Sequence, residues 1–84
     1  MDHTVRLLFF SLLQNIVGSD EIDREIPETG ISTGDLLDQL FEEFEGLASW
    51  KDKLLIAVNC EYADANTQVK PGDEVAIMPP VQGG

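Results

Sequence analysis

The chain ends in the stretch EVAIMPPVQGG, residues 74–84, which predicts both the last strand of a sheet and a tail beyond it. In residues 74–78 the side chains alternate between two faces, and Val75 and Ile77 share the more apolar one. The two prolines that follow have no backbone N–H and hold φ near −65°, so they cannot continue a sheet ladder. We therefore expect a folded domain over residues 1–78 that ends where the prolines begin.

Residues 79–84 are predicted to form a flexible, extended tail that carries a reactive C-terminal carboxylate. The last two residues are glycines, which lack a Cβ atom, so the carboxylate of Gly84 can enter a channel too narrow for side chains. Extended residues span roughly 3.3 Å each, so the tail reaches about 20 Å. An ordinary frayed C-terminus is the alternative. The predicted tail consists of Pro79, Pro80, Val81, Gln82, Gly83 and Gly84.

Hydrophobic period and turn residues predict the remaining elements. The sequence predicts strands at 5–10, 21–26, 54–59, 67–69 and 74–78, a short helix at 11–17, and a main helix capped by Ser32. Residues 61–66 are predicted to be a polar turn. The apolar stripe of the main helix consists of Leu36, Leu37, Leu40, Phe41, Phe44 and Leu47. This order predicts an α+β fold in which the main helix crosses a mixed sheet of four to five strands.

Strand alternation also predicts an exposed apolar surface. If every second residue from Val5 to Phe9 faces the core, Phe10 and Met78 lie on the open face of the sheet, and Tyr62 in a nearby loop is a third candidate. Exposed apolar groups of this kind mark a contact surface. The alternatives are that loops cover these residues or that the alternation is displaced by one.

The composition indicates one small, acidic domain. The chain has 84 residues, of which 43% are hydrophobic, and its 16 acidic and 5 basic residues give a formal net charge of −11. This charge repels nucleic acid and anionic membranes and favours encounter with a basic partner surface. Simple solubility is the competing explanation.

The single cysteine and the single histidine predict no metal site. Cys60 has no second cysteine with which to form an internal disulfide, and His3 lies near the chain end. Strand alternation from Ile56 through Val58 predicts that the Cys60 thiol is inert and partly buried. The apolar stretch 7–13 is too short for a signal peptide or a membrane span, so we expect a cytoplasmic protein.

Four stretches together resemble the small subunit of molybdopterin synthase. They are VRLLFF at 5–10, GDLL at 34–37, AVN at 57–59 and GDEVAIMPPVQGG at 72–84. The resemblance covers nearly the whole chain, and the Pro-Pro-Val-x-Gly-Gly end is its most specific part. Met78 stands where that family commonly has a larger hydrophobic residue, and Cys60 stands where a polar residue is expected. The resemblance implies the ubiquitin-like β-grasp fold.

The resemblance also implies a function, that of a sulfur carrier in molybdenum cofactor biosynthesis. An activating enzyme of the ubiquitin-activating type would use ATP to adenylate the carboxylate of Gly84, and sulfur would then replace the adenylate. The tail would carry the resulting thiocarboxylate into the large catalytic subunit, where cyclic pyranopterin monophosphate receives the sulfur. Two small and two large subunits would form a heterotetramer. The chain itself would hold no permanent cofactor and would be non-catalytic.

Other functions remain open at this point. A sulfur carrier for thiamine synthesis or for tRNA thiolation would use the same terminal chemistry with another acceptor. A ubiquitin-like protein modifier would join Gly84 to a lysine amine, and a plain binding module would have no use for the two glycines. Cys60 is the rival to Gly84 as the group that bears the sulfur.

Overall fold

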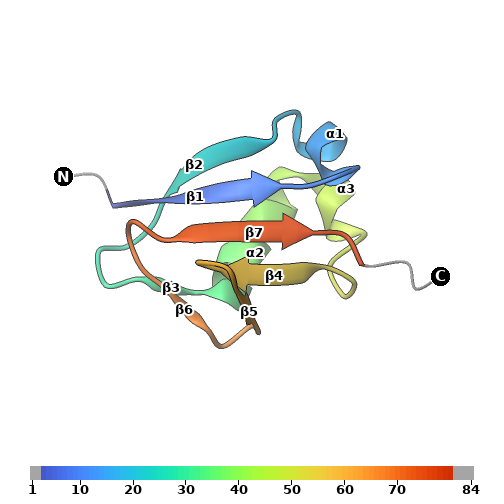
Figure 1. Ribbon diagram of the computed structural model, residues 1–84. Coiled ribbons are helices and arrows are strands. Elements are labelled where there is room, and N and C mark those ends of the chain that lie inside the picture. Colours follow the sequence, from blue (N-terminus) through green and yellow to red (C-terminus); the bar gives the residue numbers. More distant parts are fainter. Residues whose placement is uncertain (1–2, 81–84) are drawn as a thin grey trace.

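The computed structural model describes residues 3–80 of the chain (Figure 1). The described residues form two β-sheets and three helices. In chain order the elements are β1 (Thr4–Phe9), α1 (Leu13–Val17), β2 (Glu21–Glu25), β3 (Ile31–Ser32), α2 (Thr33–Glu43), α3 (Glu45–Ala48), β4 (Leu55–Val58), β5 (Glu61–Ala63), β6 (Gln68–Val69) and β7 (Glu74–Met78).

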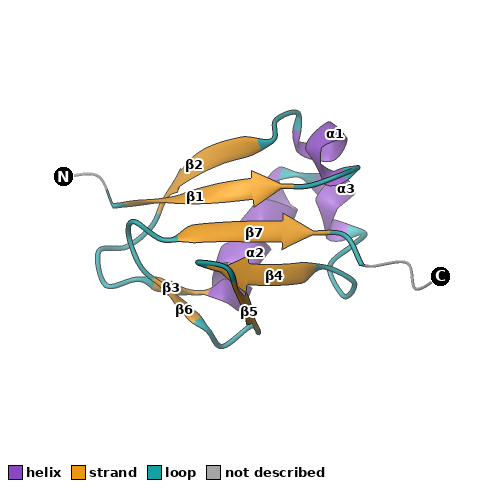
Figure 2. Ribbon diagram, viewed as in Figure 1, coloured by secondary structure: helices purple, strands orange, loops and turns teal. Residues whose placement is uncertain are grey.

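Five of the strands form the main sheet, in the order β2-β1-β7-β4-β5. The central strands β1 and β7 are parallel, whereas the other neighbouring pairs are antiparallel. Helix α2 crosses one face of this sheet (Figure 2). The structure therefore confirms the predicted α+β fold with a mixed sheet and one main helix.

The core lies between the main sheet and the helices. Val5, Leu7 and Phe9 of β1 are each no more than 1% exposed, and β7 contributes Val75 and Ile77, which are fully buried. The same cluster includes leucines of α2 and α3 and four further residues, Leu13, Ile26, Ile56 and Val69. Burying one such side chain contributes about 1.5–3 kcal/mol, so the alternation of β1 and β7 fixes which face of the sheet is covered. The opposite face remains open.

The main helix begins as the sequence predicts but ends earlier. Ser32 is its N-cap, and the Ser32 hydroxyl accepts a hydrogen bond of 3.1 Å from the backbone N–H of Asp35. Phe44 is extended, with φ −119° and ψ 93°, so the apolar stripe that was predicted to continue to Leu47 is divided between α2 and α3. Acidic residues at the end of α2 oppose the helix dipole, which favours ending the helix there.

The prediction of a polar turn over residues 61–66 is confirmed in its second half, where Ala65 and Asn66 form a turn, and was wrong in its first half, because residues 61–63 form β5. The turn that precedes β5 contains only Asn59 and Cys60, which have φ values of 51° and 72°. Positive φ at both central residues is the geometry of a type I′ hairpin turn, which usually contains glycine. Because neither turn residue is glycine, the sequence pattern did not indicate a hairpin at this point.

The predicted edge strand at 67–69 is confirmed in part, since Gln68 and Val69 form β6. It pairs with β3, a strand that the sequence did not predict, in a separate two-stranded sheet. A strand of only two residues shows no hydrophobic period.

Candidate functional site

The end of β7 determines where the tail leaves the domain. Met78 lies opposite Leu55 of β4, and the backbone N–H of Phe10 donates a hydrogen bond of 3.3 Å to the carbonyl oxygen of Ile77. Both neighbouring strands therefore hold the last residues of β7. Pro79 and Pro80 follow and are half-buried.

The other four residues of the predicted tail are Val81, Gln82, Gly83 and Gly84, and they lie outside the described residues. The boundary between residues 78 and 79, the flexibility of the tail and the reactivity of Gly84 therefore stay predictions.

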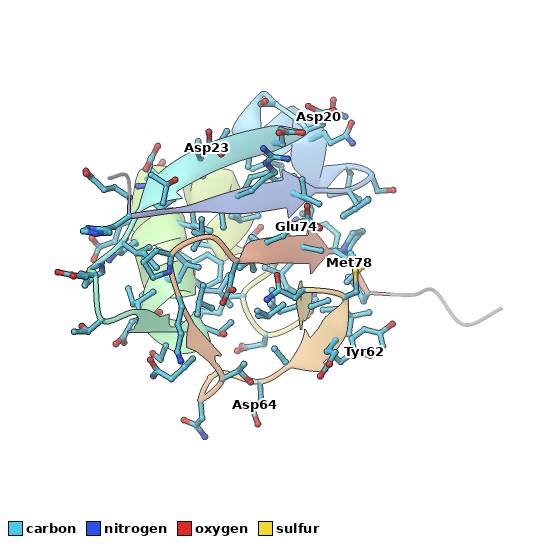
Figure 3. The ribbon with its side chains drawn as sticks, turned by 60° about the vertical axis from the view of Figure 1, so that its left-hand side comes forward. Asp20, Asp23, Tyr62, Asp64, Glu74 and Met78 are labelled. Carbon is cyan, nitrogen blue, oxygen red and sulfur yellow. The ribbon has the colours of Figure 1, made fainter. Side chains whose placement is uncertain are left out.

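A hollow lies on the open face of the sheet beside this exit. It has a volume of about 290 Å³, and its lining residues are Ala57, Cys60, Tyr62, Ala76 and Met78. Ala57 lies opposite Tyr62 on one side and opposite Ala76 on the other, so three strands contribute one continuous cross-strand row. Figure 3 shows Tyr62 and Met78 on the same side of the molecule, near the point where β7 ends. The small side chains of the two alanines form the floor of the hollow.

Two of the three predicted contact residues belong to this hollow. Tyr62 is 80% exposed, and Met78 is half-buried at the rim. Phe10 is 43% exposed, as predicted, but it follows β1 and therefore lies on the other side of β7. Leu12 is exposed to a similar degree, and sequence reasoning missed it because it precedes the buried Leu13 in an apolar run. The role of these residues as an interface stays a prediction.

The expectation of a partly buried thiol was wrong, because Cys60 is exposed. The alternation of β4 ends at Val58, and the hairpin turn then reverses the chain and brings Cys60 to the rim of the hollow. Strand alternation cannot be extended through such a turn.

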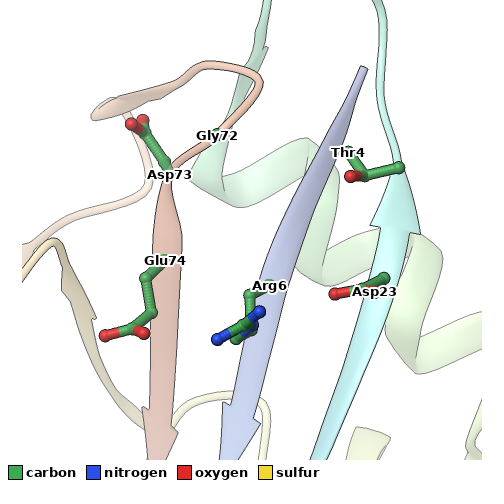
Figure 4. Close-up of a pocket in the computed structure, with 6 residues that line it drawn as sticks. All are labelled: Thr4, Arg6, Asp23, Gly72, Asp73 and Glu74. Atoms are coloured by element: carbon green, nitrogen blue, oxygen red, sulfur yellow. The ribbon is translucent and has the colours of Figure 1, made fainter. Parts of the chain in front are cut away.

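A polar pocket lies at the opposite end of β7 (Figure 4). Arg6 occupies its centre, opposite Asp23 of β2 and Glu74 of β7. The Asn59 side chain lies nearby: its carbonyl oxygen accepts a hydrogen bond of 3.0 Å from the N–H of Glu74, and its amide donates one of 3.0 Å to Asp73. These polar groups hold the start of β7 against the β4–β5 turn.

Two further properties apply to residues 3–80. They contain no group of three or more His, Cys, Asp or Glu residues arranged to hold a metal ion. No helix in this part of the chain is long and apolar enough to cross a membrane.

The sequence pattern of the ThiS family matches residues 7–84. The molybdopterin synthase sulfur carrier subunit of Drosophila melanogaster is 39% identical over 83 residues, which cover 95% of this chain and 90% of that protein. The corresponding subunit of Dictyostelium discoideum is 30% identical over 86 residues, which cover 100% of this chain and 100% of that protein.

Solved structures show the same fold. The small archaeal modifier protein 1 of Haloferax volcanii superposes with a TM-score of 0.81 at 26% identity, covering 93% of this chain and 98% of that one. A chain from the complex of subunits 1 and 2 of the Helicobacter pylori molybdopterin-converting factor gives a TM-score of 0.68 at 28% identity, covering 96% and 99%. The predicted ubiquitin-like β-grasp fold is thereby confirmed. The relatives are sulfur carrier subunits of molybdopterin synthase, at 30–39% identity along nearly the whole length of this chain. Because the family match runs from β1 to the last glycine, this β-grasp protein belongs to the ThiS family.

Proposed function

We propose that this chain is the sulfur carrier subunit of a molybdopterin synthase and that Gly84 bears the sulfur as a C-terminal thiocarboxylate. The observation that carries the proposal is the extent of the similarity. The family match includes Gly84 itself, and the similarity to the named sulfur carrier subunits extends over nearly the whole chain. The acceptor of the sulfur is cyclic pyranopterin monophosphate.

The chemistry begins with activation of the Gly84 carboxylate, which is a poor electrophile. An activating enzyme joins it to the AMP portion of ATP, and pyrophosphate leaves. A sulfur donor bound to that enzyme then attacks the carbonyl carbon, and AMP leaves with the electron pair of the broken C–O bond. With a persulfide as the donor, the product is an acyl disulfide. A second thiolate of the partner enzyme then attacks the donor's own sulfur, so that the S–S bond breaks, the thiocarboxylate leaves and a disulfide forms on the partner. ATP is thus consumed by the partner enzyme, and this chain holds no permanent cofactor.

The large subunit supplies the acid–base groups, and this chain supplies the sulfur atom. We assign its docking to the open face of the sheet near the end of β7, where Tyr62 and Met78 surround the hollow and Phe10 lies across β7. From this face Pro79 to Gly83 lead Gly84 into the active site of the large subunit. The Helicobacter pylori complex of subunits 1 and 2 supports a partner of this kind. A heterotetramer of two small and two large subunits, working in the cytoplasm, completes the proposal.

The test is molybdopterin formation by a reconstituted synthase that contains either the full chain or the chain without Gly84. Deletion should abolish product while thermal unfolding stays unchanged, because the reactive carboxylate is displaced but the core of the domain is untouched. Undiminished product from the shortened chain would contradict the proposal. Appending one alanine after Gly84 is the matched variant, since it keeps both glycines and blocks the same carboxylate.

A second candidate function is protein modification. It is favoured by the similarity to the small archaeal modifier protein 1, whose TM-score of 0.81 exceeds that of the Helicobacter pylori chain. A lysine amine would attack the same Gly84 adenylate and form an isopeptide bond as AMP leaves. Conjugates that survive a denaturing gel, and that disappear when Gly84 is deleted, would support this function.

A further inference from the structure

In the part of the chain that the structure describes, strand β2 forms a free edge of the main sheet, because β1 is its one neighbour there. Two hydrogen bonds establish the pairing pattern: the N–H of Phe9 donates to the carbonyl oxygen of Asp20 (2.8 Å), and the N–H of Ile26 donates to that of His3 (2.7 Å). Bonded and non-bonded positions alternate in an antiparallel pair. The even-numbered residues of β2 therefore turn their backbone groups toward β1, and the odd-numbered residues turn theirs outward.

The three odd-numbered residues of β2 differ in what satisfies these outward groups. Both outward groups of Glu21 are hydrogen-bonded to the Ser19 side chain. The Ser19 hydroxyl donates to the carbonyl oxygen of Glu21 (2.8 Å) and accepts from the N–H of Glu21 (3.4 Å). Within residues 3–80, the outward N–H and C=O groups of Asp23 and Glu25 have no protein partner. An unpaired strand edge of this kind is a template for one more strand.

A groove lies along this edge on the side of the helices. It has a volume of about 470 Å³, and β2 and α2 contribute most of its lining. Val17, Ile22 and Phe44 provide half-buried apolar surface in it, and an ion pair between Arg24 and Glu43 crosses it. An added strand would direct every second side chain into this groove.

The other side of the edge is acidic. Glu21, Asp23 and Glu25 lie on the open face of the sheet, because they are opposite Leu8, Arg6 and Thr4. Arg6 forms an ion pair of 3.3 Å with Glu21, so the carboxylates of Asp23 and Glu25 remain available to pair with basic side chains of a partner. The remaining side chains of an added strand would meet these carboxylates, so basic residues fit there.

A second copy of this chain does not fit the same edge. Pairing of two β2 strands would place one acidic row beside another, and the formal charge of −11 on each chain would oppose the approach. We propose that the free edge of β2 binds an extended segment of a partner protein in which lysine or arginine alternates with aliphatic residues. The segment joins the main sheet as a sixth strand, at the edge opposite β5, and this surface is separate from the hollow beside Met78.

The probe for a direct test is a short synthetic peptide in which lysine alternates with valine. Two methylated forms are compared, one with methyl groups on all lysine backbone nitrogens and one with them on all valine nitrogens. The N–H groups of alternate residues leave opposite edges of a strand, so strand addition requires that only one of the two forms binds. Equal binding of both forms, or binding of neither, would overturn the proposal without affecting the assignment of Gly84.

Amide hydrogen exchange locates the bound peptide on the full chain. Saturating peptide should slow exchange of the Asp23 and Glu25 amides at least about tenfold, whereas the Ile22 and Arg24 amides, already bonded to β1, should change little. Binding without protection of Asp23 and Glu25 would mean attraction between charges only, and it would contradict strand addition.

A pair of variants separates the backbone contribution from the charge. Asp23→Pro removes an outward N–H without removing a bond to β1, and it should abolish binding. Asp23→Asn removes only the charge and should weaken binding about two- to fivefold at low salt, with the difference fading as salt rises. If Asp23→Pro is folded, as judged by circular dichroism, and binds like Asp23→Asn, the edge is not the binding site.

Discussion

Ala57 of β4 lies directly opposite Ala76 of β7, and these two small side chains form the floor of the hollow between Tyr62 and Met78. Larger residues at either position would fill the hollow. If the large subunit docks on this face, as proposed above, the pair leaves room for one of its side chains beside the end of β7.

Ala76→Leu should weaken binding to the large subunit about tenfold or more, because the added side chain occupies the hollow and overpacks the interface. The stability of the isolated chain should change by no more than about 0.5 kcal/mol, since Ala76 lies on the open face of the sheet and the hollow has room for the added side chain. Calorimetric titration against the large subunit measures the effect. Thr4→Leu is the matched control, since Thr4 lies at the far end of the same face, in the polar pocket around Arg6. Equal loss of affinity in both variants would show that the hollow has no special role.

Phe10→Ala should reduce affinity for the large subunit by more than about 2 kcal/mol if this ring is an anchor of the interface. Glu42→Ala, on the exposed face of α2, should have a small effect that disappears at high salt. The same titration at two salt concentrations separates the two cases. A folded Phe10→Ala chain that binds like the wild type would remove Phe10 from the interface and leave Tyr62 and Met78 as its candidates.

Gly30→Ala should destabilise the domain more than Gly72→Ala. Both glycines have positive φ, at 96° and 94°, and left-handed backbone costs a non-glycine residue about 1–2 kcal/mol. A Cβ at Gly30 would also lie 2.7 Å from the carbonyl oxygen of Val69, whereas a Cβ at Gly72 would meet open space. Urea unfolding of the two variants compares these costs directly. Equal losses of stability would mean that the strand pair β3–β6 can move apart cheaply.

Cys60→Ser should leave both stability and sulfur acquisition unchanged, because the thiol is exposed and the sulfur is assigned to Gly84. Cys60→Gly should raise stability by about 0.5–1 kcal/mol, because Cys60 has φ 72° in a hairpin turn that favours glycine. Denaturant unfolding measures the stability of both variants, and intact mass after sulfur loading measures sulfur acquisition by Cys60→Ser. A folded serine variant that acquires no sulfur would return Cys60 to the mechanism.

The sequence predicts those parts of the fold that depend on local patterns. The alternation in residues 74–78 and the capping hydroxyl of Ser32 identify β7 and the start of α2, because burial and hydrogen bonding repeat with the period of each element. The end of α2 is different: its apolar stripe continues past Phe44, and only the packing of α3 shows that the helix stops. Gly46 illustrates this packing, since a Cβ there would lie 3.0 Å from a methyl carbon of Ile16 on α1.

Features that depend on strand order cannot be predicted in this way. The free edge of β2 and its groove exist because β2 is the outermost strand, and no local pattern in residues 21–25 indicates that position. The hollow likewise combines Ala57, Tyr62 and Ala76 from three strands. Tyr62 and Met78 could be proposed as contact residues, but the alanine floor between them required the register of the sheet.

Intact mass spectrometry of the chain after incubation with ATP, the activating enzyme and a sulfur source tests the central claim most directly. The wild-type chain and Cys60→Ser should each gain the mass difference between one sulfur and one oxygen atom, located by fragmentation at Gly84, and a chain without Gly84 should gain none. Sulfur on the shortened chain, or sulfur on Cys60 in the wild type, would contradict the assignment of the terminal carboxylate as the sulfur-bearing group.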